Sequence, residues 1–327
     1  MQHSPLISIL LPFKNASGWI EETIRSIVEQ SYENWELIAV DDDSKDNSAG
    51  IIERFKDGRI QIFKNTGEGI IPALQLALEK SSGEFITRMD ADDIIPPDKL
   101  SNLLSLVETS TERKVATGLV QYFSKGSVSP GYLKYEDWLN ERCVKNDHFN
   151  HIYRECVVAS PNWLVKKSFL VKDQIFNRLK YPEDYDMTFQ WLKHGYEIVS
   201  SEQVTHLWRE HPERTSRNSD IYQQKSFFQL KLKWFLELNP RINELAVFGA
   251  GPKGKLVIEI LSSHLKLNWY DVQHEKFKSQ VLGHTISDPE KCTEKFALIA
   301  VYPNELNSLE NYLKSLDFEI GQNAWYV

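Results

Sequence analysis

Acidic side chains stand directly after apolar segments of this chain, the position at which open α/β sheets bind ligands. The clearest group is Asp90-Ala91-Asp92-Asp93, which follows the segment Glu84 to Met89. Residues two apart in an extended segment point the same way, so Asp90 and Asp92 can face one site. Their oxygens suit Mg²⁺ or Mn²⁺, and such an ion would bridge the diphosphate of a nucleotide donor. A solvated turn or a helix cap before Pro96 is the simpler alternative.

A second acidic group, Asp41-Asp42-Asp43-Ser44, follows another apolar segment. An Asx-turn that begins the next helix explains part of this group. Two acidic groups at one edge of a sheet would nevertheless crowd like charges together. A bound cation, or hydrogen-bond donors from a nucleotide base and ribose, would relieve that repulsion.

Two later segments carry groups that a transfer reaction needs. Glu183 and Asp184 precede apolar residues at helical spacing, so they are either acids favoured at a helix N-terminus or a general base for an acceptor hydroxyl. The segment His206 to Arg217 concentrates cationic and imidazole groups. It is either a surface loop with local ion pairs or a flap over a diphosphate, in which arginine contacts phosphate and histidine contacts metal. The candidates for these contacts are Arg209, Arg214 and His211.

Apolar runs that alternate with amphipathic helical segments must position these groups. The runs are Ile7 to Leu11, Glu36 to Val40, Arg59 to Phe63 and Glu84 to Met89. Strands and helices that alternate at this spacing predict βαβ units and a parallel sheet. Lys14-Asn15 and both acidic groups follow these runs, so all three point at one crevice outside the carboxyl ends of the strands. The less regular region 100–217 is expected to build the other half of the site.

A separate unit is predicted after an amphipathic helix from Asp220 to Leu238, which Pro240 ends. In this unit a strand at Leu245 to Phe248 leads into a glycine-rich loop and a helix, and the next strand ends in an acid. The residues of this pattern are Gly249, Gly251, Gly254 and Asp271. This is the setting of a dinucleotide-binding fingerprint. About 80 residues hold only half of a typical dinucleotide fold, so a docking domain with a vestigial loop is the favoured interpretation.

Composition limits the classes of function. The chain has 327 residues and a net charge of −8, so we expect no binding to nucleic acid through a basic surface. Three cysteines without the spacing of a zinc site or a disulfide framework fit a reducing compartment. No apolar run approaches the roughly 20 residues that span a bilayer, and Met1 to Pro5 lacks the basic start of a signal peptide. We therefore expect a cytoplasmic protein of unknown oligomeric state, with peripheral attachment to the inner face of the membrane left open.

Five blocks of the chain resemble family 2 glycosyltransferases of the GT-A fold, in the order of that family. They are Ile9 to Asn15, Val40 to Ser48, Met89 to Asp93, Tyr181 to Leu192 and His211 to Ser216. The sequence departs from the common pattern at Lys14, where an aromatic residue is frequent, and at Asp43, where glycine is frequent. The C-terminal unit resembles the small Rossmann-like domains attached to sugar-modifying acyltransferases.

The resemblance implies an α/β chain with a GT-A nucleotide-diphospho-sugar transferase fold at residues 1–218, a helical linker at 219–243 and a small Rossmann-like α/β domain at 244–327. It implies inverting transfer of a sugar from a nucleotide-diphosphate donor, a UDP-sugar, to a hydroxyl of a glycan or lipid-linked acceptor in cell-surface polysaccharide synthesis. Mn²⁺ or Mg²⁺ would be the cofactor. The implied roles are nucleotide contacts for Pro12, Phe13, Asn15, Asp42 and Asp90, metal binding for Asp92 and His211, and action as the catalytic base for Asp184.

Three other classes of function compete with this one. A nucleotidyltransferase usually opens with a glycine- and arginine-rich phosphate loop, and Pro12 to Asn15 is not such a loop. An NAD-dependent oxidoreductase built on Gly249 to Gly254 would leave the acidic groups of the first domain unexplained. A non-catalytic nucleotide-sugar-binding protein would have no need for intact metal and base residues. The sequence does not identify the sugar, the acceptor or the linkage.

Overall fold

The computed structural model describes residues 4–214, 224–301 and 306–327. The chain divides into two units. The first comprises Met1–His148 and Val158–Asn218, and the second comprises Phe149–Val157 and Ser219–Val327. A short segment, residues 149–157, therefore belongs to the second unit although the sequence of the first unit continues on both sides of it.

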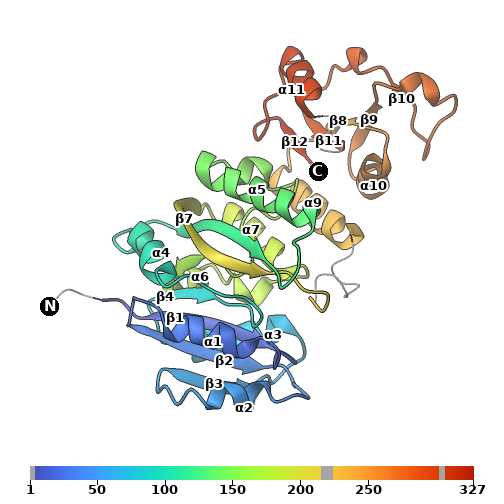
Figure 1. The fold of residues 1–327 in the computed structure, drawn as a ribbon. Helices are drawn as coiled ribbons and strands as arrows, with labels where there is room; N and C mark the ends of the chain where they lie inside the picture. Colours follow the sequence, from blue (N-terminus) through green and yellow to red (C-terminus); the bar gives the residue numbers. More distant parts are fainter. Residues whose placement is uncertain (1–3, 215–223, 302–305) are drawn as a thin grey trace. The chain divides into compact units, whose positions relative to one another are not determined.

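One mixed sheet forms the centre of the first unit. Its strands are β1 (Ile7–Phe13), β2 (Trp35–Asp41), β3 (Ile60–Lys64), β4 (Phe85–Arg88), β5 (Lys114–Phe123), β6 (Leu164–Lys166) and β7 (Glu197–Arg209). They lie in the order β3-β2-β1-β4-β6-β5-β7 (Figure 1). The neighbours among β1 to β4 pair in parallel, as the alternation of strands and helices predicts, whereas β6 runs antiparallel to β4 and β5. The carboxyl ends of β1, β2 and β4 therefore meet at one edge.

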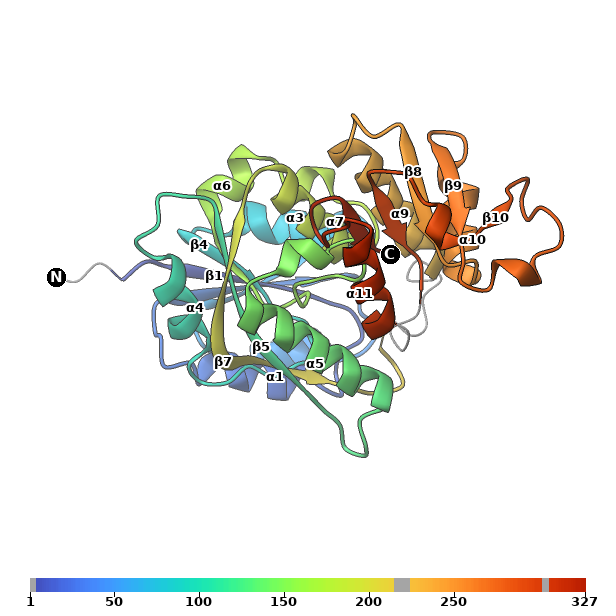
Figure 2. The same cartoon turned by 90° about the horizontal axis from the view of Figure 1, so that it is seen from above.

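A second, smaller sheet forms the centre of the second unit. Its strands are β8 (Glu244–Phe248), β9 (Lys266–Tyr270), β10 (Ile286–Ser287), β11 (Ala297–Ile299) and β12 (Ala324–Tyr326). All neighbours pair in parallel, in the order β10-β9-β8-β11-β12. Figure 2 shows β8 and β9 side by side. This is the strand order of a doubly wound sheet, in which the direction of winding reverses beside the first strand.

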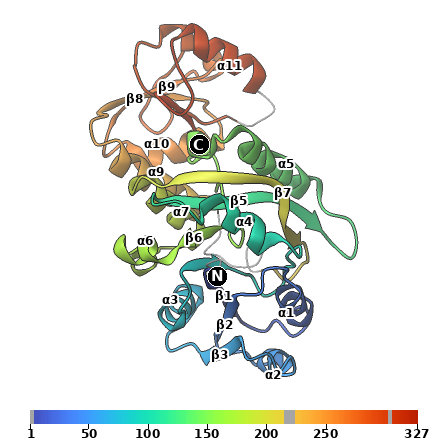
Figure 3. The ribbon, with the colours of Figure 1, turned by 90° about the vertical axis from the view of Figure 1, so that its left-hand side faces the viewer.

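Helices cover both faces of each sheet. The first unit contains α1 (Ile20–Val28), α2 (Ser48–Glu53), α3 (Ile70–Lys80), α4 (Lys99–Val107), α5 (Pro130–Lys145), α6 (Lys167–Lys172) and α7 (Glu183–Lys193). The second contains α9 (Gln224–Leu238), α10 (Pro252–Leu261) and α11 (Leu306–Ser315). α1 and α3 lie on opposite sides of β1 and β2, as α10 and α11 do for the smaller sheet (Figure 3). Covering on both faces explains why the parallel strands are continuous apolar runs.

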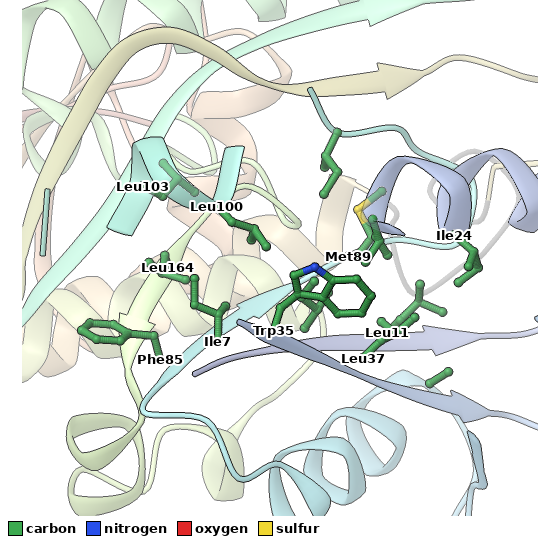
Figure 4. Close-up of a cluster of buried hydrophobic side chains, with 14 of the residues drawn as sticks. Ile7, Leu11, Ile24, Trp35, Leu37, Phe85, Met89, Leu100, Leu103 and Leu164 are labelled. Atoms are coloured by element: carbon green, nitrogen blue, oxygen red, sulfur yellow. The ribbon is translucent and has the colours of Figure 1, made fainter. Parts of the chain in front are cut away.

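The core of the first unit follows from the alternation of side chains along its strands. Ile7 and Leu11 of β1 point to the face that α1 and α4 cover, where they meet Ile24 and Leu100 (Figure 4). Trp35 and the other members of this cluster are almost completely buried. This packing holds the strand ends, and the polar loops that follow them, in fixed positions.

The core of the second unit includes α9 and the segment 149–157. The helix predicted from Asp220 to Leu238 is present from Gln224, and residues 220–223 lie outside the described residues. The ring of Tyr153 packs edge-on against Phe235 of α9, at 5.4 Å between centroids, and against Trp325 of β12, at 6.3 Å. The segment 149–157 is thus built into this core. No helix in the described ranges is long and apolar enough to cross a membrane.

Candidate active site

Asp42, at the carboxyl end of β2, is the centre of the predicted nucleotide side of the site. Its Oδ1 accepts hydrogen bonds from Asn65 Nδ2 (2.7 Å) and from the backbone N–H of Gly69 (2.9 Å). Its Oδ2 lies 3.2 Å from Lys14 Nζ. Burial raises the pKa of Asp42, but the hydrogen bonds from Asn65, Gly69 and Lys14 outweigh burial, so the pKa lies below its usual value. Asp42 is therefore an ionised acceptor at neutral pH.

The loop after β1 lies beside this acid. Pro12 and Phe13 are both buried at the end of β1. Asn15 adopts a left-handed backbone conformation with φ 50°, which asparagine tolerates better than most residues. Its Oδ1 accepts a hydrogen bond from the backbone N–H of Lys45 (2.7 Å), and its own N–H donates to Ser44 Oγ (3.0 Å). Asn15 thus joins the loops after β1 and β2, and its contact with a nucleotide stays a prediction.

Asp90, the first carboxylate after β4, is held by a buried arginine. Arg88 Nε lies 2.8 Å from Asp90 Oδ1, and Arg88 Nη1 lies 3.0 Å from Glu183 Oε1. Burial raises the pKa of Asp90, and the charges of Asp92 and Glu183 raise it further, against the opposing charge of Arg88. The two ion pairs of Arg88 join the end of β4 to the start of α7.

Asp92 and His211, the predicted metal ligands, are in direct contact. His211 Nε2 lies 2.8 Å from Asp92 Oδ2, and the Asp92 side chain is 27% exposed. Burial raises the pKa of Asp92, but the hydrogen bond from His211 and the charge of Arg214 bring it below its usual value. Asp92 therefore presents an ionised carboxylate.

The pair Asp92–His211 fits a divalent ion that arrives together with a diphosphate. In the described part of the chain, Nδ1 of His211 is buried and has no hydrogen-bond partner. No three His, Cys, Asp or Glu side chains form a complete metal cage within the described residues. Mg²⁺ in nucleotide sites takes one or two protein carboxylates and completes its shell with substrate phosphates and water. A carboxylate beside an imidazole with an unused nitrogen is a donor set of this kind.

Asp184 lies in the first turn of α7. Its Oδ1 accepts a hydrogen bond from the N–H of Tyr185 (2.8 Å), and it forms no ion pair with the described residues. Burial, followed by the charge of Glu183, raises the pKa of Asp184 to about 7, although Arg88 opposes this. The neighbouring acids are engaged: Glu183 pairs with Arg88, and Asp186 accepts two hydrogen bonds. Asp184 is the acid of this segment that is best suited to exchange a proton near neutral pH.

The two arginines predicted to contact diphosphate differ in their surroundings. Arg209 Nη2 lies 2.5 Å from Glu22 Oε2, and Arg209 Nε donates to the carbonyl oxygen of Asp92 (2.6 Å). The Arg209 guanidinium is thus engaged within the fold. Arg214 Nη1 donates to the carbonyl oxygen of Arg209 (3.1 Å), its guanidinium lies 5.1 Å from the centre of the Trp208 ring, and its charge acts on Asp92. A phosphate contact stays a prediction for both arginines, and residues 215–217 of the predicted flap lie outside the described residues.

The glycine-rich loop of the second unit is closed on itself. Gly249 has φ +101°, and a Cβ at Gly254 would lie 1.9 Å from the carbonyl oxygen of Gly249. These two glycines are therefore required by the tight turn and by the close approach of the helix. Asp271 Oδ2 accepts a hydrogen bond from the N–H of Ala250 (2.7 Å), whereas Gly251 has open space around it. A nucleotide contact for this loop stays a prediction.

Three residues that sequence reasoning did not single out contribute to the site. They are Asn65 and Gly69 beside Asp42, and Arg88 between Asp90 and Glu183. His206, the first residue of the predicted loop or flap, instead belongs to β7 and is buried behind the acidic loop, 2.9 Å from Asp93 Oδ2. Asn65 directly follows β3, so the rule that strand ends carry ligands could have found it. Arg88 is the last residue of a buried strand, and its spacing carries no signal.

The sequence profile described as Glycosyl transferase family 2 matches residues 8–171, just over half of the chain. The chain belongs to glycosyl transferase family 2. This finding confirms the family that the five blocks resemble. The match ends before α7 and β7, and of the second unit it includes only residues 149–157, so the family assignment rests on the part of the chain that carries Asp42 and Asp92.

Characterised and uncharacterised glycosyltransferases are among the relatives of this family 2 chain. An uncharacterized glycosyltransferase of Haemophilus influenzae is 42% identical over 106 residues, which are 32% of this chain and 42% of that protein. The Escherichia coli enzyme WfgD, a UDP-Glc:alpha-D-GlcNAc-diphosphoundecaprenol beta-1,3-glucosyltransferase, is 40% identical over 103 residues, 31% of this chain and 41% of that protein. Glycosyltransferase GlyG of Streptococcus pneumoniae is 24% identical over 204 residues, 62% of this chain and 68% of that protein. The first two similarities thus span less than half of the length of these relatives.

Solved structures confirm the predicted GT-A fold. Residues 1–349 of TarS from S. aureus, in complex with UDP-GlcNAc, match with a TM-score of 0.53 at 17% identity, over 79% of this chain and 72% of that chain. The mannosyltransferase PcManGT from Pyrobaculum calidifontis, in complex with GDP-Man and Mn²⁺, matches with a TM-score of 0.53 at 17% identity, over 80% of this chain and 70% of that chain. At this identity the likeness concerns the fold alone.

Proposed function

We propose that this chain is an inverting glycosyltransferase that moves a sugar from a UDP-sugar to a hydroxyl of a glycan or lipid-linked acceptor. One observation carries the proposal: Arg88 pairs with Asp90 at 2.8 Å and with Glu183 at 3.0 Å, so it joins the loop after β4 to the first turn of α7. That loop carries Asp92, which contacts His211, and that turn carries Asp184, so a donor set for a cation and a carboxylate that can accept a proton are joined at one end of the sheet. Transfer from a nucleotide sugar needs both.

The nucleotide would bind beside Asp42. This carboxylate is ionised and held by Asn65 and Gly69, so it is preorganised to accept hydrogen bonds from a base. The hydroxyl of Tyr181 lies close to Gly69, only 2.8 Å from where a Cβ of that glycine would be. Tyr181 is three residues before Asp184, so the loop at Gly69 adjoins both the nucleotide side and the segment of the proposed base.

The reaction would proceed by direct displacement. Asp184 accepts the proton of the acceptor hydroxyl as that oxygen attacks the anomeric carbon, opposite to the departing diphosphate, so the configuration inverts. Asp92 and His211 would hold Mn²⁺ or Mg²⁺, which supplies Lewis-acid stabilisation of the charge on the leaving diphosphate when bound. Arg214 adds a positive charge on the same side of the site.

The names of relatives support a role in cell-surface polysaccharide synthesis. WfgD uses UDP-Glc and a diphosphoundecaprenol-linked sugar, and TuaG of Bacillus subtilis, 32% identical over 152 residues, is a putative teichuronic acid biosynthesis glycosyltransferase. A lipid-linked acceptor of this kind would place the enzyme at the inner face of the membrane. Several aromatic residues of α9, including Phe228 and Phe235, are buried. We therefore propose contact with the membrane through the acceptor rather than through α9.

The second unit would be a Rossmann-like docking or acceptor-side module without a role in hydride transfer. Its strand order supports the Rossmann-like assignment. The acid that would bind a ribose, Asp271, already accepts hydrogen bonds from the N–H groups of Ala250 and Gln273, each at 2.7 Å. A dinucleotide would have to compete with both contacts.

A thermal-shift comparison of UDP, GDP, ADP and CDP, each with and without Mn²⁺, tests the proposed function. UDP with Mn²⁺ is expected to raise the melting temperature most, because a ligand at 100 times its Kd stabilises the folded state by about 2.7 kcal/mol. UDP without metal is expected to give a smaller shift. The absence of a shift with every nucleotide in the presence of Mn²⁺ would contradict the proposal.

A further inference from the structure

A chain of buried polar side chains lies directly behind the acidic loop after β4. Lys99 of α4, His206 of β7 and Asp93 are 1%, 0% and 1% exposed. Lys99 Nζ lies 3.5 Å from His206 Nδ1 and donates to the carbonyl oxygen of Pro161 (2.6 Å). His206 Nε2 lies 2.9 Å from Asp93 Oδ2. With Lys99 as donor to Nδ1, a neutral His206 carries its proton on Nε2 and donates it to Asp93.

The same chain continues to the proposed metal ligands. The second oxygen of Asp93 accepts a hydrogen bond from the backbone N–H of Arg209 (2.8 Å). Arg209 Nε in turn donates to the carbonyl oxygen of Asp92 (2.6 Å). His211 is only two residues beyond Arg209, and its Nε2 lies 2.8 Å from Asp92 Oδ2. Asp93 therefore ties the loop that carries Asp92 to the end of the strand that precedes His211.

Stability alone does not account for this arrangement. Burial lowers the pKa of Lys99 to about 7 and the pKa of His206 well below its usual value, as expected for groups that have lost their hydration. Buried charged groups often contribute no more stability than apolar residues of similar volume. A role in fixing one geometry therefore accounts better for this group of side chains than a role in stability. The geometry fixed here is the spacing between Asp92 and His211.

We propose that His206 is a positioning residue of the metal site, which sets the distance between Asp92 and His211 through Asp93 and Arg209. The inference rests on the proposed function, because it assumes that Asp92 and His211 hold the ion. Partners behind metal ligands commonly change metal affinity by about 10–100-fold when they are lost. A purely structural role for His206 would instead lower the melting temperature and leave the affinity for metal unchanged.

The test compares His206→Gln with His206→Asn in the full-length chain. The glutamine amide reaches the position of Nε2 and can donate to Asp93, whereas the shorter asparagine amide does not. Mn²⁺ binding is measured in saturating UDP from the electron paramagnetic resonance signal of free Mn²⁺, and the melting temperature is measured in parallel. The matched control is Thr205→Val, because Thr205 is the adjacent residue of β7, is equally buried, and donates instead to Asn162 (2.8 Å).

His206→Asn is expected to weaken Mn²⁺ binding by about 10–100-fold, with His206→Gln within about threefold of wild type. Thr205→Val is expected to lower the melting temperature without changing Mn²⁺ affinity. Equal affinities in the asparagine and glutamine variants would overturn the inference while leaving the proposed function intact. Absence of Mn²⁺ binding by the wild-type chain with UDP would refute the proposed function and this inference with it.

A second variant covers the case in which both His206 variants fail to fold. Glu22 is the exposed partner of Arg209, so Glu22→Ala loosens the same chain from the solvent side without disturbing the core. It is expected to weaken Mn²⁺ binding by about two- to fivefold, the scale of one ion pair at the surface. An unchanged affinity in this variant would overturn the inference.

Discussion

Replacing Asp184 with asparagine distinguishes the proposed role of this side chain as a base from its structural role. Asparagine has nearly the same shape, and its carbonyl oxygen can still accept the hydrogen bond from the N–H of Tyr185. It cannot accept a proton from an acceptor hydroxyl. Binding of UDP with Mn²⁺ should therefore survive in Asp184→Asn, while sugar transfer should fall by about 10²–10⁴-fold, the usual effect of losing a general base.

The pKa of Asp184 sets how transfer should depend on pH in the wild-type chain. With a pKa of about 7, Asp184 is about one-eleventh ionised at pH 6 and about ten-elevenths ionised at pH 8. Only the ionised form accepts a proton, so kcat/KM should rise about tenfold between these values, with a bend near pH 7. Glu183→Gln removes a charge that raises this pKa, so the bend should move to lower pH.

Stability supplies an independent measurement of the same pKa. The folded pKa of Asp184 lies above its usual value of 3.8, so ionisation opposes folding. The wild-type chain should therefore lose stability relative to Asp184→Asn as the pH rises from about 4 to about 7, and the difference should be constant above that. Thermal unfolding of both proteins across this range measures the difference. A gap that does not change with pH would show that the pKa is not raised.

Initial rates of UDP release, with and without an acceptor, provide the assay of transfer. Transfer by Asp184→Asn within a few-fold of the wild-type rate would refute the assignment of the base. A value of kcat/KM that is constant between pH 6 and pH 8 would refute the reasoning from the pKa. Either result would make the neighbouring acids the next candidates for the base. Glu183 could act as the base only after its ion pair with Arg88 is broken.

Three further predictions concern the metal, α9 and the second unit. Asp92→Ala should abolish the Mn²⁺-dependent part of UDP binding, measured by isothermal titration, and leave the far-ultraviolet circular dichroism unchanged; undiminished Mn²⁺-dependent affinity would contradict the ligand assignment. The full chain should not float with anionic liposomes, because Phe228 and Phe235 are buried and Lys231 of the same helix is only 4% exposed. Isothermal titration of the full chain with NAD, NADP and S-adenosylmethionine should show no binding, because Asp271 is engaged; micromolar affinity for any of them would make the protein bifunctional.

Position after a strand is the rule by which sequence reasoning selected Asp42 and Asp92. The period of alternation identifies the strands, and the structure confirms that the loops after β2 and β4 lie at the carboxyl edge of a parallel sheet. Lys99 and Arg88 belong to regular elements, where a charged residue usually indicates an exposed face. Their burial depends on long-range partners, Pro161 for Lys99 and Glu183 for Arg88, and no local pattern reports such partners.

The segment 149–157 shows a second limit of the same kind. Nothing in its composition separates it from the surrounding residues, yet Tyr153 packs on Phe235 and Trp325, which lie more than eighty positions later in the chain. The boundaries proposed at 218 and 243 follow changes in the pattern of apolar and polar residues along the chain. The nine residues 149–157 are too short a segment to change that pattern. Only packing in three dimensions assigns this segment to the second unit.

The surroundings of the acids in the site give them different pKa values, and these values suit the acids to different roles. Burial raises the pKa of Asp90, Asp93 and Asp184, because a carboxylate with little water around it is costly to ionise. The negative charges of neighbouring carboxylates raise these pKa values further. Asp92 is the exception, since the hydrogen bond from His211 and the charge of Arg214 keep it ionised. A permanently charged carboxylate is suited to a cation, whereas one with a pKa near 7 is suited to accept and release a proton. A cation bound at Asp92 would also offset the negative charge that raises the pKa of Asp90. Metal binding and ionisation of the acids around Asp90 would therefore favour one another.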